Sequence, residues 1–232
     1  MKKLVLGTLV AVFGVGCVAA DEPNINATWS IQTVDGANVG CPTGFDTAVV
    51  VAQEVDAAGN PVGTPFEDLY DCAAGAGHSA PLPASTYQTW VEITSHDGSQ
   101  LYAQSLSAFV DIIDTDKTIN VAILDDGGYF QLQWDLRRTV GGAPVSCTEV
   151  DGVGALTTDI SDATNSHDDK FTCNDGFGIT GGLTAGTYTV SVDAFADGPG
   201  GGSLGPATTL TNRVIQDRNR VTDLGTVTVN VD

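Results

Sequence analysis

Histidine, cysteine and hydroxyl side chains are the groups of this 232-residue sequence that could carry covalent or acid–base chemistry. A nucleophilic site needs a Ser, Thr or Cys beside a base. His78, His96 and His167 all stand in polar stretches typical of loops, and no GxSxG, HExxH or phosphate-binding glycine motif accompanies them. The sequence therefore predicts no catalytic residue and no enzyme. The alternative, a secreted hydrolase, would need a convergent polar pocket.

Cys17 ends a segment with the pattern of a bacterial export signal. Two lysines precede an apolar run over residues 4–15, and small residues follow. The Gly-Val-Gly-Cys sequence that ends at Cys17 resembles a lipobox, in which the cysteine becomes the lipidated first residue of the mature protein. We expect residues 1–16 to be a lipoprotein signal peptide and the protein to lie at the outer membrane or surface of a Gram-negative bacterium. The alternative is ordinary cleavage after Ala20, which would give a soluble periplasmic or secreted protein.

The remainder of the chain contains one unit twice. The sequence CAAGAG that begins at Cys72 matches CNDGFG at Cys173, and LPASTY ending at Tyr87 matches LTAGTY ending at Tyr188. Both matches fall at the same offset along the chain. Each copy has about 100 residues, the size of a small β-sandwich domain. We therefore predict a tether over residues 17–27, repeat 1 over 28–125 and repeat 2 over 126–232.

The repeat also predicts how the cysteines pair. One disulfide within each copy, Cys41–Cys72 and Cys147–Cys173, uses four of the five cysteines and leaves Cys17 for lipid attachment. Pairing between the copies is the alternative. Disulfides imply an oxidising compartment, which agrees with the export signal.

Strand patterns dominate both copies, and helix patterns are almost absent. Short β-branched or aromatic segments are separated by Gly, Asp, Asn and Pro. The segments predicted as strands are residues 29–34, 48–55, 86–94, 118–124, 130–137, 187–194 and 226–231. The chain is therefore expected to be all-β.

The ten residues LTAGTYTVSV that begin at Leu183 resemble the L-P-A-G-x-Y-x-V-x-V signature of transthyretin-like β-sandwich repeats. These repeats include the carboxypeptidase regulatory-like and collagen-adhesin B-type modules. Residues 82–91 carry a weaker form of the same motif. The resemblance implies two tandem Ig-like or transthyretin-like β-sandwich domains, in each of which a turn leads into a core strand with a buried Tyr. As a whole, the chain resembles modular surface lipoproteins of Gram-negative bacteria.

The three tryptophans are predicted to have different roles. Trp29 and Trp134 match between the copies and should pack in the cores near the disulfides. Trp90 has no counterpart, because Ser191 occupies its place in repeat 2. Alternation along the strand turns Trp90 outward, where it would stack on a sugar or anchor a partner. The alternative is that a loop, the tether or the neighbouring domain covers it.

Charge restricts the ligands that the chain would bind. The formal net charge is −20, and removal of a leader with two lysines leaves 29 acidic and 7 basic residues, a charge of −22. Such a surface repels nucleic acid. Asp159, Asp162, Asp168 and Asp169 crowd between the cysteines of repeat 2 and are candidate ligands for calcium, which takes about six to eight oxygens. A solvated acidic surface is the alternative, and no other cofactor is expected.

Together these observations predict a lipid-anchored, non-enzymatic protein of the cell envelope that serves as a binding or spacer module. Its expected partners are the membrane, through the lipid, and a surface protein or glycan. A carbohydrate-binding module that uses an exposed aromatic side chain is the alternative.

Overall fold

The computed structural model describes residues 23–196 and 202–232, which form an all-β fold without an α-helix. The elements of repeat 1 are β1 (Ile25–Gln32), β2 (Thr47–Glu54), β3 (Phe66–Asp71), η1 (Cys72–Ala74), β4 (Ala76–His78), β5 (Ser85–Thr94), β6 (Leu101–Gln104), β7 (Ala108–Ile112) and β8 (Lys117–Leu124). Those of repeat 2 are β9 (Gly127–Arg138), β10 (Gly152–Asp159), β11 (Ser166–Thr172), η2 (Cys173–Asp175), β12 (Phe177–Ile179), β13 (Leu183–Thr184), β14 (Gly186–Phe195), β15 (Thr208–Ile215) and β16 (Arg220–Val231).

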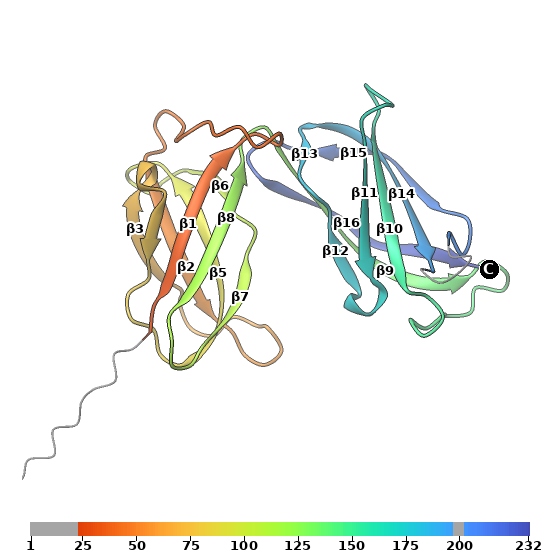
Figure 1. The fold of residues 1–232 in the computed structure, drawn as a ribbon, viewed down its shortest axis with the longest axis horizontal. Helices are drawn as coiled ribbons and strands as arrows, with labels where there is room; N and C mark the ends of the chain where they lie inside the picture. The colour runs from red at the N-terminus through yellow and green to blue at the C-terminus, as the bar shows by residue number, and fades with distance from the viewer. Residues whose placement is uncertain (1–22, 197–201) are drawn as a thin grey trace, which may run out of the picture.

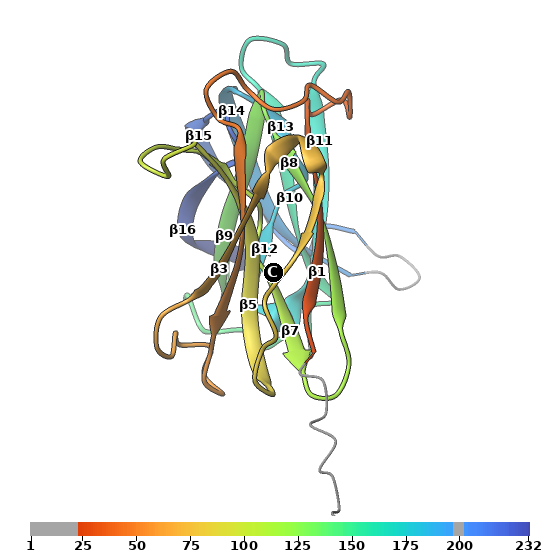
Figure 2. The ribbon, with the colours of Figure 1, turned by 90° about the vertical axis from the view of Figure 1, so that its left-hand side faces the viewer.

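Repeat 1 consists of two β-sheets packed face to face (Figure 2). One sheet has the order β4-β1-β8, and the other has the order β3-β2-β5-β6, with β7 also paired to β5. Strand β5 alternates as a half-buried strand should, with Tyr87, Thr89, Val91 and Ile93 completely buried and the residues between them partly exposed. Of these, Tyr87, Val91 and Ile93 belong to the hydrophobic core, which also contains residues of β1, β2 and β8.

Repeat 2 has a matching arrangement beside repeat 1 (Figure 1). Its sheets are β12-β9-β13, with β16 also paired to β9, and β11-β10-β14-β15. In both repeats the first and last strands pair in parallel, β1 with β8 and β9 with β16. The prediction of two tandem β-sandwiches is confirmed.

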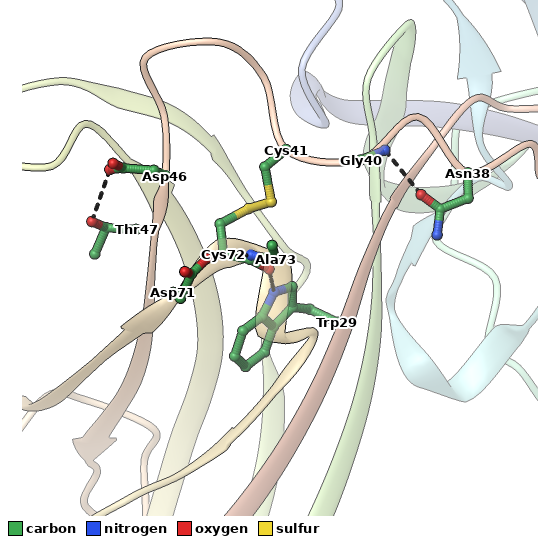
Figure 3. The surroundings of a disulfide bond; sticks show 9 residues. All are labelled: Trp29, Asn38, Gly40, Cys41, Asp46, Thr47, Asp71, Cys72 and Ala73. Carbon is green, nitrogen blue, oxygen red and sulfur yellow. Dashed lines mark hydrogen bonds between the residues drawn. A yellow bond between two sulfur atoms is a disulfide. The ribbon is translucent and has the colours of Figure 1, made fainter.

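A disulfide, a tryptophan and a short 3-10 helix form the same unit in each repeat. Cys41 is joined to Cys72, with 6.1 Å between their Cα atoms, and Cys147 to Cys173, with 5.5 Å. The indole Nε1 of Trp29 donates a 2.8 Å hydrogen bond to the carbonyl oxygen of Cys72 (Figure 3). Trp134 donates in the same way to Cys173, at 3.1 Å. The matched cysteines and tryptophans therefore belong to one structural unit.

Two glycines follow the second cysteine of each repeat, and the structure requires each of them for a different reason. Gly75 ends η1 with φ +65°, a left-handed conformation that favours glycine. Gly77 lies against a ring, since a Cβ atom there would be 2.5 Å from the ring of Tyr70. Gly178 stands in the same relation to Phe171, at 2.6 Å. The spacing of these glycines thus follows from a turn and an aromatic ring packed against the next strand.

The tyrosine of each L-x-A-x-x-Y motif is buried, as the resemblance implies. The hydroxyl of Tyr87 donates a 3.0 Å hydrogen bond to the carbonyl oxygen of Pro83. Tyr188 donates to Thr184 at 2.9 Å. Each hydroxyl thereby satisfies a carbonyl of the turn that leads into its own strand.

The N-terminal boundary of repeat 1 differs from the prediction. Strand β1 begins at Ile25, so the last three residues of the predicted tether belong to the sandwich. Ile25 and Ala27 are completely buried, and β1 is bonded to β4 on one side and β8 on the other. Polar Asn24 and Asn26 made this stretch resemble a linker. The predicted signal peptide, Cys17 and the start of the tether lie outside the described residues.

Candidate binding surface

The described residues contain no nucleophile paired with a histidine. His96 lies 3.5 Å from Asp46, and the imidazole Nε2 of His167 lies 3.3 Å from Asp169. Within residues 23–196 and 202–232, no hydrogen bond joins a His side chain to a Ser, Thr or Cys side chain. The part of the chain that the structure describes also has no helix long and apolar enough to cross a membrane.

The four candidate calcium ligands are not brought together. Asp159 and Asp162 each accept hydrogen bonds from the residue two positions later, Ser161 and Thr164, within exposed turns. Those from Thr164 hold the pKa of Asp162 below its usual value. Asp168 and Asp169 lie on β11, where Asp169 accepts from the backbone N–H of Gly181 at 2.9 Å. Among the described residues, no three His, Cys, Asp or Glu side chains form a group suited to a metal ion.

Trp90 has the predicted orientation. It lies on β5 between completely buried Thr89 and Val91 and is itself partly exposed on the outer face of the sheet. Its Nε1 donates a 2.8 Å hydrogen bond to the carboxylate of Glu92, two residues along the same face. The indole is therefore held in one orientation by its own strand. A role in ligand binding stays a prediction.

Other apolar side chains lie on the same face as Trp90. Val51 is paired with Trp90, and Val49 with Leu69 of β3. On the other side of β5, Phe109 of β7 is paired with Gln88. We call Val49, Val51, Leu69, Trp90 and Phe109 the repeat 1 outer face. Leu69 and Phe109 are 65% and 62% exposed, so this face presents apolar surface to solvent.

The equivalent face of repeat 2 is more polar. There Gly154 is paired with Lys170 and with Asp193, and Leu156 with Asp168 and Ser191. Its aromatic residue, Phe195, is covered by the ammonium group of Lys170, which lies 5.0 Å from the ring centroid. The two repeats therefore share a fold but expose different surfaces.

Asn219 joins the two repeats. It lies in the turn between β15 and β16, has φ +59° and is only 4% exposed. Its Oδ1 accepts a 2.7 Å hydrogen bond from the backbone N–H of Leu124, and its Nδ2 donates at 2.8 Å to the carbonyl oxygen of Gln104. One side chain of repeat 2 thus satisfies two backbone groups of repeat 1. No sequence motif identified this residue; an Asn in a turn before a strand was the only signal.

Tyr102 adds a second contact to this joint. Its hydroxyl is hydrogen-bonded to the carboxylate of Asp125 at the junction of the repeats, and the guanidinium of Arg218 lies 5.0 Å from its ring centroid. Burial, together with the bond to Asp125, raises the pKa of Tyr102 to about 12. On the other side of the junction, Asp126 accepts a 2.8 Å hydrogen bond from the backbone N–H of Val34. The joint is therefore held by contacts from both repeats.

Comparisons with known proteins give no family. No family model and no curated protein matches this sequence. Among solved structures, a leucine-rich repeat protein from Bacteroides thetaiotaomicron is 12% identical to this chain, with a TM-score of 0.43. The match covers 90% of this chain but only 26% of that protein, so this chain spans about a quarter of its length. The minor pilin of Streptococcus agalactiae is 13% identical with a TM-score of 0.33, covering 90% of this chain and 94% of the pilin.

The fimbrial anchor protein of Porphyromonas gingivalis is 11% identical with a TM-score of 0.29, covering 74% of this chain and 77% of that protein. TM-scores at this level do not define a shared fold. We therefore infer the architecture from the sheets of this chain and its function from the surfaces of this chain.

Proposed function

We propose that this chain is an exported, non-enzymatic protein of the bacterial cell envelope, attached by lipid at Cys17, whose two β-sandwich modules hold a binding surface away from the membrane. The joint at Asn219 is the observation that carries this proposal. A buried side chain that bonds to the partner module at 2.7 Å and 2.8 Å supports a fixed relation between the modules, as a spacer requires. Among the described residues, no Ser, Thr or Cys side chain is hydrogen-bonded to a histidine side chain.

The lipid attachment is tested with the full chain produced in a Gram-negative host. The wild-type protein is expected to take up labelled fatty acid, to fractionate with the outer membrane and to begin at residue 17 by intact mass. The Cys17→Ala variant should lose the label. A wild-type protein that begins at residue 21 and carries no lipid would instead support the soluble alternative.

The spacer role is tested by small-angle X-ray scattering of the purified protein. A fixed joint predicts one elongated particle whose scattering agrees with the arrangement in Figure 1. Replacement of Asn219 by Gly removes both hydrogen bonds across the joint and should broaden the distribution of particle dimensions. Scattering of the wild-type protein that requires two freely moving modules would contradict the spacer role.

A further inference from the structure

We infer that the repeat 1 outer face binds a cationic polypeptide through apolar contacts surrounded by carboxylates. This inference names the partner for the binding role proposed above. It does not depend on lipid attachment, because it concerns a surface of the folded sandwich.

The apolar character of this face is not required by the fold. Repeat 2 forms the same sheet with Gly154 where repeat 1 has Val49, and with Ser191 where repeat 1 has Trp90. At the place of exposed Leu69 it has Lys170. The second copy keeps an apolar side chain only at the place of Val51, where it has Leu156. Because it folds with Gly154, Ser191 and Lys170 at the other places, Val49, Trp90 and Leu69 of repeat 1 are available for another purpose.

The aromatic side chains of this face are neighbours on the sheet. Val51 lies on the outer face of the sheet but is only 2% exposed. Its direct neighbours on the adjacent strands are Trp90 and Glu67. Val51 is therefore covered by the side chains around it, while Trp90, its direct neighbour, is partly exposed. Phe109 is a diagonal neighbour of Trp90 through the pair that it forms with Gln88, at about 7–8 Å. Trp90 and Phe109 are thus neighbouring aromatic side chains on the same face of the sheet.

Carboxylates border this apolar surface. Glu92 lies beside Trp90, and Glu67 lies opposite Val51. Next to Leu69 is a hollow of about 480 Å³, lined by Asp46, Thr47, Leu69, Tyr70, Asp71 and His96. Figure 3 shows Asp46 and Asp71 near the disulfide at this end of the sheet. A basic side chain that enters the hollow would meet both carboxylates while its neighbours contact Leu69.

The wider charge of repeat 1 favours the same class of partner. Residues 23–125 contain 13 acidic side chains and one basic side chain, Lys117, whereas residues 126–232 contain 14 and six. Lys117 begins β8, which belongs to the other sheet. The net charge is therefore −12 in the first range and −8 in the second, so a cationic partner is attracted more strongly to repeat 1 than to repeat 2. A neutral glycan would stack on Trp90 and donate hydroxyl hydrogen bonds to these carboxylates, but only a cationic partner would also gain from their negative charge.

The test measures binding of the purified full chain to a synthetic peptide of alternating Lys and Leu, with a Glu–Leu peptide and a panel of neutral oligosaccharides as the other probes. Binding is followed by tryptophan fluorescence and by calorimetry. The Lys–Leu peptide is expected to bind, and to bind more weakly as salt is added, because salt screens the charges. The Glu–Leu peptide and the oligosaccharides are expected not to bind.

Three variants locate the site. Trp90→Ser and Leu69→Lys introduce the residues that repeat 2 carries, and each should weaken binding of the Lys–Leu peptide by about tenfold or more. Leu156→Ser, on the equivalent face of repeat 2, is the matched control and should bind as the wild type does. Should Trp90→Ser fail to fold, Leu69→Lys and Phe109→Ser serve instead, because both side chains are mostly exposed.

Equal binding by the wild type and by these repeat 1 variants would overturn the inference, as would an equal loss in Leu156→Ser. Binding of an oligosaccharide in a Trp90-dependent manner, without binding of the Lys–Leu peptide, would replace it with a glycan site. None of these results would affect the test of lipid attachment.

Discussion

Replacing Asn219 by Gly should uncouple the two repeats. The substitution keeps the left-handed backbone, since glycine adopts φ +59° freely, and removes only the side chain. The N–H of Leu124 and the carbonyl of Gln104 then lose their partners. A buried polar group without a partner costs about 1–3 kcal/mol. Because the bond to the Gln104 carbonyl is only partly buried, we expect the free energy of coupling between the repeats to fall by about 2–4 kcal/mol in total. Asn219→Ala should lose about 1 kcal/mol more, because of strain at positive φ.

Differential scanning calorimetry measures this coupling. The wild type should unfold in one transition, and Asn219→Gly in two, as each repeat unfolds separately. Asn212→Gly is the control, because Asn212 also has a positive φ, 54°, but is exposed on β15. If Asn219→Gly unfolds like Asn212→Gly, in one unshifted transition, the side chain does not couple the repeats and our reasoning is wrong.

Three further predictions concern the sandwiches themselves. Gly77→Ala would place a Cβ 2.5 Å from the ring of Tyr70 and should destabilise the protein by about 1–3 kcal/mol in urea unfolding, whereas Gly202→Ala, with open space around it, should be neutral. Reduction of the disulfides, which span 31 and 26 residues, should lower the free energy of unfolding by about 3–4 kcal/mol for each bond; an unchanged melting temperature in reductant would contradict this. The pKa of Tyr102 is raised from 10.0 to about 12 in the folded protein, so its neutral phenol stabilises the fold. This stabilisation is fully present below pH 10 and should be lost as the pH rises to 12. Tyr102→Phe should abolish that loss, and ultraviolet titration of tyrosinate checks the pKa itself.

The fold was predictable where the two copies could be compared. The constant offset identified the residues that form the disulfide unit and the tyrosine-containing turn, and regular alternation identified β5 and β14. Short strands such as β4 and β13 were not predicted, because three or two residues carry no period. The longer strands β10, β11 and β15 were not predicted either, because glycines in β10 and polar residues in β11 and β15 obscure the strand pattern. The start of β1 was missed because Asn24 and Asn26 are polar, although Ile25 and Ala27 between them are buried.

The candidate surface was predictable only in part. Alternation placed Trp90 outward, and its mismatch with Ser191 distinguished it from the core tryptophans. Leu69 and Phe109 could not be associated with it, because they lie on short edge strands whose register is set by tertiary pairing. The role of Asn219 could not be predicted for a related reason. Its partners, Leu124 and Gln104, are far away in sequence, and only the tertiary structure places them beside this turn residue.

The parallel pairing of first and last strands has a mechanical consequence for a protein held at one end and pulled at the other. The chain enters repeat 1 at Ile25 and leaves it at Leu124, at opposite ends of two strands bonded to each other, with Ile25 facing Lys117 and Gln32 facing Leu124. Tension along the chain therefore acts in shear on all the bonds between β1 and β8 at once and cannot open them one after another. Strands β9 and β16 transmit force through repeat 2 in the same way. Both modules should resist extension far better than sandwiches whose terminal strands can be peeled from an edge.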